Sequence, residues 1–414
     1  MKKRQLVKKL KQSLEVSPIV YLNGMRQSGK STLVLSLIES GQIDAEYITF
    51  DNPTQMYAAA SAPDAFLRAM KKSVVIDEVQ LVPEIFRVLK TLVDDMRFEN
   101  KGKVSGKYLL TGSANIMGLP KMSDPLVGRM VPITLYPFSG SEIIGSEGKF
   151  IDNLFEKKFQ KNREMDIDIL DVMRKATFPE ISGQHYDTRE IWFNGYLTTL
   201  LQRDVRALAQ LEKIAIIPQL FKVLASRVGN LINESEIGRE LQLNSVTTKT
   251  YRNILKLMFL VFDIEPWSRN LGKRLVKSPK GYIGDTLLMC HLLGIHLETL
   301  PVVDSKLFGH VLENFVATEL KKLLSFSDKR LDLYHFRTQD GKEVDFVIEK
   351  PSGEVAGIEV KASESLKTDD FKGLRILKAE VGKKFCAGVI LYRGKDVVAF
   401  EEDLYAVPLS ALWS

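Results

Sequence analysis

The segment from Gly24 to Thr32 constrains the fold of this chain more than any other. It reads GMRQSGKST and directly follows the apolar run PIVYLN at residues 18–23. In the spacing G-x-x-x-x-G-K-S, the glycines let successive backbone N–H groups point inward at phosphate oxygens. The lysine brings a charge to the β- and γ-phosphates, and the serine hydroxyl ligates Mg²⁺. Because an apolar helix pattern follows, we predict a strand, a phosphate-binding loop (P-loop) and a helix.

This loop assigns ATP and Mg²⁺ as cofactors. Lys30 is expected to act on the phosphates in catalysis, and Ser31 is expected to hold the metal. The helix that begins here directs its positive N-terminal dipole at the same phosphates. The expected nucleotide contacts are Gly24, Met25, Arg26, Gln27, Ser28, Gly29, Lys30, Ser31 and Thr32.

A second strand is predicted at residues 73–80, SVVIDEVQ, where an apolar run ends in Asp77 and Glu78. In an open parallel sheet, ligands bind beyond the carboxyl ends of the strands. Asp77 would hold Mg²⁺ through the metal's water shell, since Mg²⁺ keeps several waters. Glu78 would polarise the attacking water. The alternative is an exposed acidic pair after a core strand.

Two further features accompany these motifs. Residues 107–115, KYLLTGSAN, read as a strand after which Thr111, Ser113 or Asn115 could reach the γ-phosphate or the attacking water; an ordinary strand-to-loop turn is the alternative. Arg129, in LVGRM, is a candidate catalytic arginine. An arginine supplied to a neighbour's γ-phosphate can raise turnover by about 10³–10⁵, and a surface salt bridge is the equal alternative.

The middle of the chain has the order of a winged helix-turn-helix. Residues 233–267 predict a helix capped by Asn233, a tight turn, a second helix capped by Ser245 or Thr247, and a strand; a basic hairpin follows. The residues expected to contact DNA phosphates are Thr247, Thr248, Lys249, Tyr251 and Arg252 on the second helix and Arg269, Lys273, Arg274, Lys277 and Lys280 on the hairpin. Packing against neighbouring domains, without DNA, is the alternative.

The last quarter carries a set of charged residues typical of nucleases. Glu313 lies on a predicted amphipathic helix, Asp345 on the strand GKEVDFVIEK, and Glu359 and Lys361 on one face of the strand GIEVKAS. The three carboxylates would gather Mg²⁺ and so acidify a bound water, and the lysine would orient that water. This arrangement resembles the restriction-endonuclease-like nucleases, and its order resembles Holliday-junction-resolvase-type enzymes. The alternative is a degenerate fold kept for binding, with these groups in surface ion pairs.

The motifs GMRQSGKST, VVIDEVQ, YLLTGSAN and ITLYPFS together resemble the AAA-type ATPases of bacteria and archaea that precede a C-terminal domain of unknown function. The resemblance continues through FPE at residues 178–180, YLTTLLQRDV at 196–205 and GHVLENFVATEL at 309–320. It therefore spans nearly the whole chain. It implies an ATPase fold with ATP-binding roles for Lys30, Ser31, Asp77 and Glu78.

Composition places the chain among soluble, cytoplasmic proteins. No stretch approaches the roughly 20 apolar residues that span a bilayer, so no membrane partner is expected. The two cysteines, Cys290 and Cys386, do not form a disulfide framework or a four-ligand metal site. The net charge of +6 mildly favours an anionic partner, but ATP alone satisfies that preference.

We therefore predict an α/β protein with three domains. They are a P-loop AAA-type ATPase domain with a parallel sheet at residues 1–140, a helical and winged helix-turn-helix domain at 141–300, and a restriction-endonuclease-like α/β domain at 301–414. The predicted function is ATP hydrolysis coupled to DNA binding or processing. The alternative is a nucleotide-operated switch whose silent nuclease fold binds a protein partner. The oligomeric state is open, and a homo-oligomer would let Arg129 act in trans.

Overall fold

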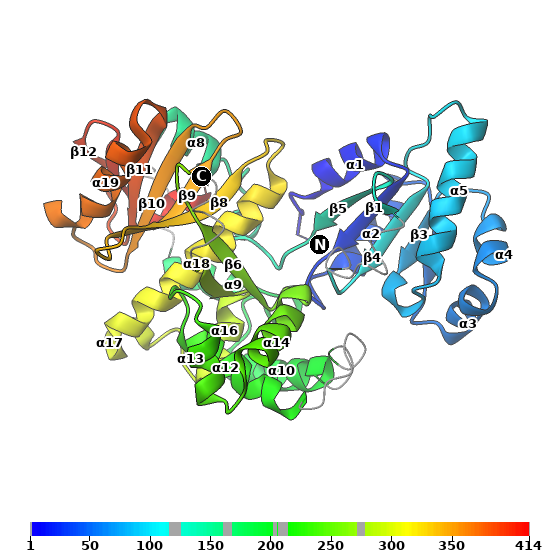
Figure 1. Cartoon of the computed structure of the whole chain (residues 1–414), viewed down its shortest axis with the longest axis horizontal. Coiled ribbons are helices and arrows are strands. Elements are labelled where there is room, and N and C mark those ends of the chain that lie inside the picture. Colours follow the sequence, from blue (N-terminus) through cyan, green and yellow to red (C-terminus); the bar gives the residue numbers. More distant parts are fainter. Residues whose placement is uncertain are drawn as a thin grey trace.

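The computed structural model describes residues 2–115, 126–159, 168–201, 205, 214–270 and 278–413. Figure 1 shows two α/β bodies, an N-terminal one in blue and cyan and a larger one built from the rest of the chain. Within the described ranges, no helix is long and apolar enough to cross a membrane.

The N-terminal body is built on a five-stranded parallel sheet. Its strands are β1 (Ile19–Asn23), β2 (Glu46–Thr49), β3 (Val74–Asp77), β4 (Tyr108–Gly112) and β5 (Met130–Thr134). Their order is β2-β3-β4-β1-β5, and every pair is parallel. All five carboxyl ends therefore meet at one edge, where the predicted motifs were expected to converge. The parallel-sheet α/β domain is confirmed.

Helices cover both faces of this sheet because its strands alternate their apolar side chains. Ile19 and Tyr21 of β1 face one cluster, and Val20 and Leu22 face the other. The first face is covered by α3 (Pro53–Ser61), α4 (Pro63–Arg68) and α5 (Ile85–Glu99), and the second by α1 (Val7–Val16) and α2 (Lys30–Glu39).

The middle of the chain is helical. Its helices are α7 (Gly140–Ile144), α8 (Phe150–Glu156), α9 (Ile169–Lys175), α10 (Tyr186–Thr199), α12 (Ile217–Ser226), α13 (Glu234–Glu240), α14 (Ser245–Leu257), α16 (Thr286–Leu293) and α17 (Leu300–Val303). Asn233 caps α13 as predicted. The cap of α14 is Asn244, not Ser245 or Thr247, because its side chain accepts from the backbone N–H of Thr247.

The C-terminal part carries an eight-stranded sheet. Its strands are β6 (Val261–Pro266), β7 (Lys280–Ile283), β8 (Asp332–Arg337), β9 (Glu343–Glu349), β10 (Val355–Lys361), β11 (Phe385–Tyr392), β12 (Val398–Glu401) and β13 (Leu404–Pro408). The order is β12-β13-β11-β10-β9-β8-β6-β7. Two helices, α18 (Ser305–Phe326) and α19 (Lys372–Val381), pack on the sheet. The predicted helix at Glu313 and the strands at Asp345 and Glu359 are thus confirmed.

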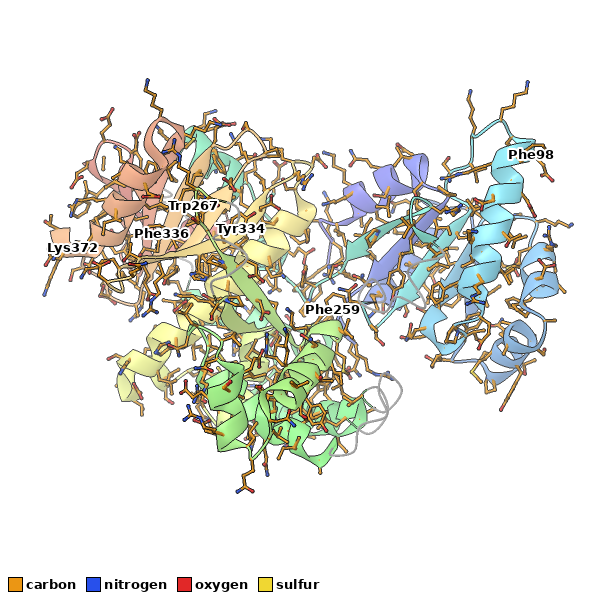
Figure 2. All side chains as sticks on the ribbon, in the orientation of Figure 1. Phe98, Phe259, Trp267, Tyr334, Phe336 and Lys372 are labelled. Atoms are coloured by element: carbon orange, nitrogen blue, oxygen red, sulfur yellow. The ribbon has the colours of Figure 1, made fainter. Side chains whose placement is uncertain are left out.

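Strand pairing and a shared hydrophobic core connect the residues on the two sides of the predicted boundary at residue 300. The strand predicted before the basic hairpin forms as β6, which pairs antiparallel with β7 and also parallel with β8 through Glu265 and Tyr334. Trp267, just after β6, places its ring 6.2 Å from that of Phe336 of β8 (Figure 2). One hydrophobic core also joins the middle helices to α18 and the C-terminal sheet. Strands β6 and β7 are therefore part of the larger sheet.

A buried ion pair on α18 anchors the connection between the two bodies. The Lys322 ammonium donates to the carbonyl of Phe138 at 2.9 Å and to the Glu319 carboxylate at 2.9 Å. Glu319 also accepts from the backbone N–H of Gly140 at 2.7 Å and from the indole N–H of Trp413 at 3.3 Å. The charges are fully desolvated, so these hydrogen bonds fix the chain where it leaves the N-terminal sheet.

Candidate functional site

The P-loop connects β1 to α2 and needs glycine at two positions. Gly24 has φ +143° and a side chain there would place its Cβ 2.1 Å from the carbonyl oxygen of Leu135. Gly29 has φ +92° and immediately precedes the first turn of α2. These positions allow the backbone to curl over the helix N-terminus, where orphan N–H groups and the helix dipole favour an anion.

Lys30 and Ser31 occupy the first turn of α2 and face into the loop. The Lys30 ammonium is buried and donates to the carbonyls of Gly24 at 3.0 Å and Met25 at 2.9 Å. The Ser31 hydroxyl lies 2.9–3.0 Å from both carboxylate oxygens of Asp77 at the end of β3. The structure thus brings together the two predicted Mg²⁺ ligands of this domain.

Asp77 is held in place by two further hydroxyl groups. Tyr47 of β2 donates to Asp77 Oδ2 at 2.8 Å, and Thr111 of β4 donates to Oδ1. The carboxylate is buried at the carboxyl edge of the sheet and accepts hydrogen bonds from three different elements. Its orientation is therefore fixed by the sheet and by α2, which suits a metal-organising role.

Glu78 follows Asp77 directly and turns into the same pocket. Its backbone adopts φ +55°, and its side chain accepts from Gln80. Burial raises the pKa of the Glu78 carboxyl above its ordinary value, although Lys30 and Gln80 act in the opposite direction. Gln80 also donates to Ser113 at 3.3 Å. Thr111 at the end of β4 therefore contacts the acidic pair directly, and Ser113 after β4 contacts Glu78 only through Gln80.

A cavity of about 320 Å³ lies over these groups. It is lined by Arg26, Gln27, Gly29, Lys30, Ser31, Thr32, Glu78, Pro179 and Glu180. The last two come from the short 3₁₀ helix η4 (Pro179–Ile181) of the middle segment, so part of this cavity's wall belongs to the larger body. The sequence offered the FPE segment only as part of a resemblance and did not place it at the loop.

Two other loop residues, Met25 and Ser28, are buried and do not line the cavity. The Met25 side chain is fully buried in the hydrophobic core shared by the middle helices and the C-terminal sheet. The Ser28 hydroxyl is buried without a hydrogen-bond partner. The loop backbone at Ser28 is fixed from behind by Arg4, whose guanidinium donates to its carbonyl at 3.0 Å. Sequence reasoning missed Arg4, because nothing in the pattern of the first residues distinguishes it from the neighbouring lysines.

These residues fit MgATP. The loop curls through two positive-φ glycines, a helix N-terminus and a buried lysine face the cavity, and Ser31 and Asp77, the predicted metal ligands, are in contact. The unpartnered Ser28 hydroxyl also lies within the loop. Ser31 and Asp77 would hold the metal, and the loop N–H groups and Lys30 would hold the phosphates.

Arg129 and Asn115 lie at opposite ends of the sheet. Asn115, after β4, donates its backbone N–H to the carbonyl of Leu257 at the end of α14, at 2.7 Å. Arg129 precedes β5, and its guanidinium pairs with both carboxylate oxygens of Asp94 at 2.7 and 2.9 Å. Arg129 lies beside the amino end of β1, whereas the P-loop follows the carboxyl end of β1. At about 3.3 Å per residue, the length of β1 places Arg129 roughly 15 Å from the P-loop of its own chain. An arginine-finger role therefore stays a prediction for a neighbour's nucleotide.

The predicted recognition helix does not present all of its chosen residues. Thr248, Tyr251 and Arg252 are buried, and Arg252 forms ion pairs with Glu234 at 2.7 Å and Asp263 at 2.6 Å. The prediction that these three residues contact DNA is therefore wrong, because their side chains are buried. Lys249 is exposed, Thr247 is half-buried, and Arg269 is exposed. Lys273, Arg274 and Lys277 lie outside the described residues.

Lys280 is the clearest correction. It was expected on an exposed wing, but its side chain is 1% exposed and its ammonium lies among carboxylates of the predicted nuclease site. It starts β7, and the long aliphatic part of a lysine can extend inward from a strand when its charge is paired.

The four predicted nuclease residues are near one another. The Asp345 carboxylate on β9 accepts the backbone N–H of Val360 at 2.9 Å, and the Lys361 ammonium donates to Glu359 at 2.9 Å. Burial and Asp345 raise the pKa of Glu359 to about 8, and they raise that of Glu313 to about 7. Among the described residues, however, no group of three His, Cys, Asp or Glu side chains is positioned to hold a metal ion. The predicted metal cluster is not assembled in this conformation.

The fold and the loop define the class of the N-terminal domain. Residues 16–144 match the family model of an AAA domain, and their fold is a P-loop NTPase-like parallel sheet. Residues 168–299 match a domain of unknown function (DUF8612), and residues 308–412 match another (DUF4143).

The chain is also similar to uncharacterized bacterial proteins and to a solved structure. An uncharacterized protein of Mycobacterium tuberculosis is 29% identical over 412 residues, which cover 99% of this chain and 84% of the relative. An uncharacterized protein of Haemophilus influenzae is 22% identical over 357 residues, 80% of each chain. A Walker-type ATPase of Pyrococcus abyssi superimposes with a TM-score of 0.42 at 14% identity, over 70% of this chain and 96% of that one.

Proposed function

We propose that this protein binds ATP with Mg²⁺ and hydrolyses it. The observation that carries the proposal is the direct contact of the Ser31 hydroxyl with both oxygens of Asp77, beside the buried Lys30 of a glycine-bounded loop. When bound, Mg²⁺ neutralises charge on the β- and γ-phosphates. The loop N–H groups and Lys30 bind and orient the phosphates.

Glu78 is the group that we assign to the attacking water. Its carboxylate follows the metal-organising Asp77 and lines the same cavity as Lys30. A carboxylate positioned there can accept a hydrogen bond from a water and orient it toward the γ-phosphate. Thr111, Ser113 and Asn115 lie on the neighbouring strand end, and Ser113 is linked to Glu78 through Gln80.

Hydrolysis of ATP by Lys30→Ala tests this proposal. The variant should lose Mg²⁺-dependent phosphate release, because the phosphates lose their buried counter-charge. Lys72→Ala is the matched control, since Lys72 lies in the same domain and its side chain is 72% exposed. Unchanged hydrolysis in Lys30→Ala, or equal loss in both variants, would refute the assignment of this loop.

We further propose that the nucleotide state is transmitted to the larger body. Three contacts support this coupling: Pro179 and Glu180 line the nucleotide cavity, Met25 is buried in the larger body's core, and Asn115 is hydrogen-bonded to Leu257. Phosphates entering the cavity meet the Glu180 carboxylate, and like charges repel. ATP binding would then move η4 and the helices attached to it.

The second candidate function is DNA binding or processing by the C-terminal part. The supporting observation is the proximity of Asp345, Glu359 and Lys361 at the ends of two neighbouring strands. Lys249 and Arg269 are exposed cations on the helix-turn-helix and after β6. In this proposal a winged helix-turn-helix would hold duplex DNA and a nuclease-like fold would act on it.

Cleavage assays on linear, single-stranded and four-way-branched DNA, with Mg²⁺ or Mn²⁺ and with or without ATP, test this candidate. Cleavage that disappears in Asp345→Ala, with ATP hydrolysis intact, would support it. An absence of cleavage on every substrate would favour the alternative, a nucleotide-operated switch that uses a silent nuclease fold to bind a protein partner. Arg129 acting on a neighbour's nucleotide would make that switch a homo-oligomer, which light scattering with ATP would detect.

A further inference from the structure

Lys280 is surrounded by three carboxylates from two other elements. Its ammonium lies 3.4 Å from Glu313 of α18, 3.4 Å from Asp345 and 3.6 Å from Glu343, both of β9. The side chain is 1% exposed, and lysine is almost never buried this deeply unless carboxylates compensate its charge. The cluster therefore has one internal cation at its centre.

The same position is the one that a divalent cation would require. Glu313 and Asp345 are two of the three carboxylates expected to gather metal, and their oxygens face Lys280. The third, Glu359, is turned to Lys361, and its other oxygen is buried without a hydrogen-bond partner. The distances to the ammonium exceed the roughly 2.1 Å at which Mg²⁺ binds oxygen, so the cluster is expanded around a larger cation.

The surroundings of Glu313 leave little space for a hydrated metal ion. Tyr282 of β7 donates its hydroxyl to Glu313 Oε1 at 2.8 Å. The backbone of Gly229 covers the other oxygen, since a Cβ at that glycine would lie 2.7 Å from Glu313 Oε2. Both contacts come from the middle segment, as does Lys280, so this segment closes the site that the C-terminal strands form.

We propose that the Lys280 ammonium is the resident cation of this carboxylate cluster and excludes divalent metal ions from it. β7 supplies the charge that a metal would otherwise supply. Metal-dependent chemistry at Asp345 then requires β7 to withdraw, because in the conformation described here Lys280 occupies the position of a divalent metal ion. This conclusion depends on neither ATP hydrolysis nor DNA cleavage.

Mn²⁺ binding to nucleotide-free protein tests the proposal. The measurements use the Ser31→Ala background, which lacks the metal ligand of the P-loop, and follow free Mn²⁺ by electron paramagnetic resonance. Wild-type Lys280 should show no Mn²⁺ binding that depends on Asp345. Lys280→Met should gain a site that binds Mn²⁺ about tenfold tighter or more than the protein with Lys280 does. Adding Asp345→Asn to this variant should remove the site. Because ATP hydrolysis is not measured here, a failure of the proposed ATPase function cannot be mistaken for a failure of this proposal.

Lys322→Met is the matched control, because Lys322 is equally buried but pairs with a single carboxylate, Glu319. Both lysine variants should unfold at lower temperature, and Mn²⁺ should restore several degrees only to Lys280→Met. Mn²⁺ binding that Asp345→Asn abolishes while Lys280 is present would overturn the proposal. So would a folded Lys280→Met that gains no site. If Lys280→Met does not fold, Mn²⁺ binding to the protein with Lys280, compared with and without Asp345→Asn, still tests the proposal. Lys280→Arg should fold and exclude Mn²⁺.

Discussion

Arg4 and Glu142 form a buried salt bridge of 3.1 Å between residues 138 positions apart in the chain. The same guanidinium donates to the carbonyl of Ser28 in the P-loop, at 3.0 Å, and to that of Tyr136. One side chain therefore ties the nucleotide loop to the connection between the two bodies.

Arg4→Ala should lower the free energy of unfolding by about 3–5 kcal/mol, because it leaves the buried Glu142 carboxylate unpaired. It should also raise KM for ATP, since the backbone at Ser28 loses its support. Denaturant unfolding and steady-state hydrolysis measure the two effects. Lys8→Ala, which removes an exposed ion pair with Asp328, should change neither. Equal stability of Arg4→Ala and the parent protein would show that Arg4 is not structural.

Glu78→Gln should reduce kcat by about 10²–10⁴ while ATP binding persists, because the amide cannot accept the proton of the attacking water. The measurement is phosphate release together with fluorescent-nucleotide binding. Glu84→Gln is the control, since Glu84 is an exposed glutamate in the same domain. Retention of normal turnover in Glu78→Gln would assign the water to another group.

The buried Asp285 should make stability depend on pH. It caps α16 by accepting from Leu288 at 3.0 Å and accepts from the Thr177 hydroxyl at 2.9 Å. Burial raises the pKa of Asp285, although Lys322 acts in the opposite direction. A raised folded-state pKa means that the folded protein binds the proton more tightly, so this stabilising contribution is lost as pH rises.

Asp285→Asn keeps the cap and removes the titration. Relative to this variant, the wild type should lose stability as pH rises from about 4, near the pKa of an unfolded aspartate, to above the raised value. Urea unfolding of both proteins at a series of pH values measures the difference. A difference that stays constant, or grows in favour of the wild type with pH, would contradict the expected pKa direction.

Gly140→Ala should destabilise the protein by about 1–3 kcal/mol through overpacking, because its Cβ would lie 2.0 Å from Nε1 of the Trp413 ring. Tryptophan fluorescence should shift to the red as Trp413 is displaced from Glu319. Gly309→Ala is the control: Gly309 lies within α18 with no atom near the new Cβ, and the change should add roughly 0.5–1 kcal/mol. A fully stable Gly140→Ala would mean that this packing is not tight.

The local parts of the fold could be predicted from sequence because short-range patterns specify them. The apolar run before Gly24, the strand ending at Asp77 and the helix carrying Glu313 are all present as expected. The pairing of β6 with β8 could not be predicted, because residues 265 and 334 are far apart in the chain and no local pattern encodes their contact.

The geometry of the P-loop could be predicted from its motif, but the residues that contact the loop from elsewhere in the chain could not. Arg4 and Glu180 reach the loop from outside its sequence window. The prediction for Lys280 was wrong for a different reason. The sequence around a basic residue does not show whether its side chain faces solvent or a buried carboxylate. Only the arrangement of Glu313, Asp345 and Lys280 in space distinguishes the two cases.

The pairing of β6 with β8 also sets where the chain can be divided. A fragment beginning at residue 301 would leave β8 with an exposed edge, which invites association with other strands. It would also carry the Glu313 and Asp345 carboxylates without Lys280. A cut between Leu135 and Gly140, directly after β5, leaves both sheets whole. Exchange of the N-terminal domain between related chains, by recombination or by design, should therefore succeed at this junction and fail at residue 300.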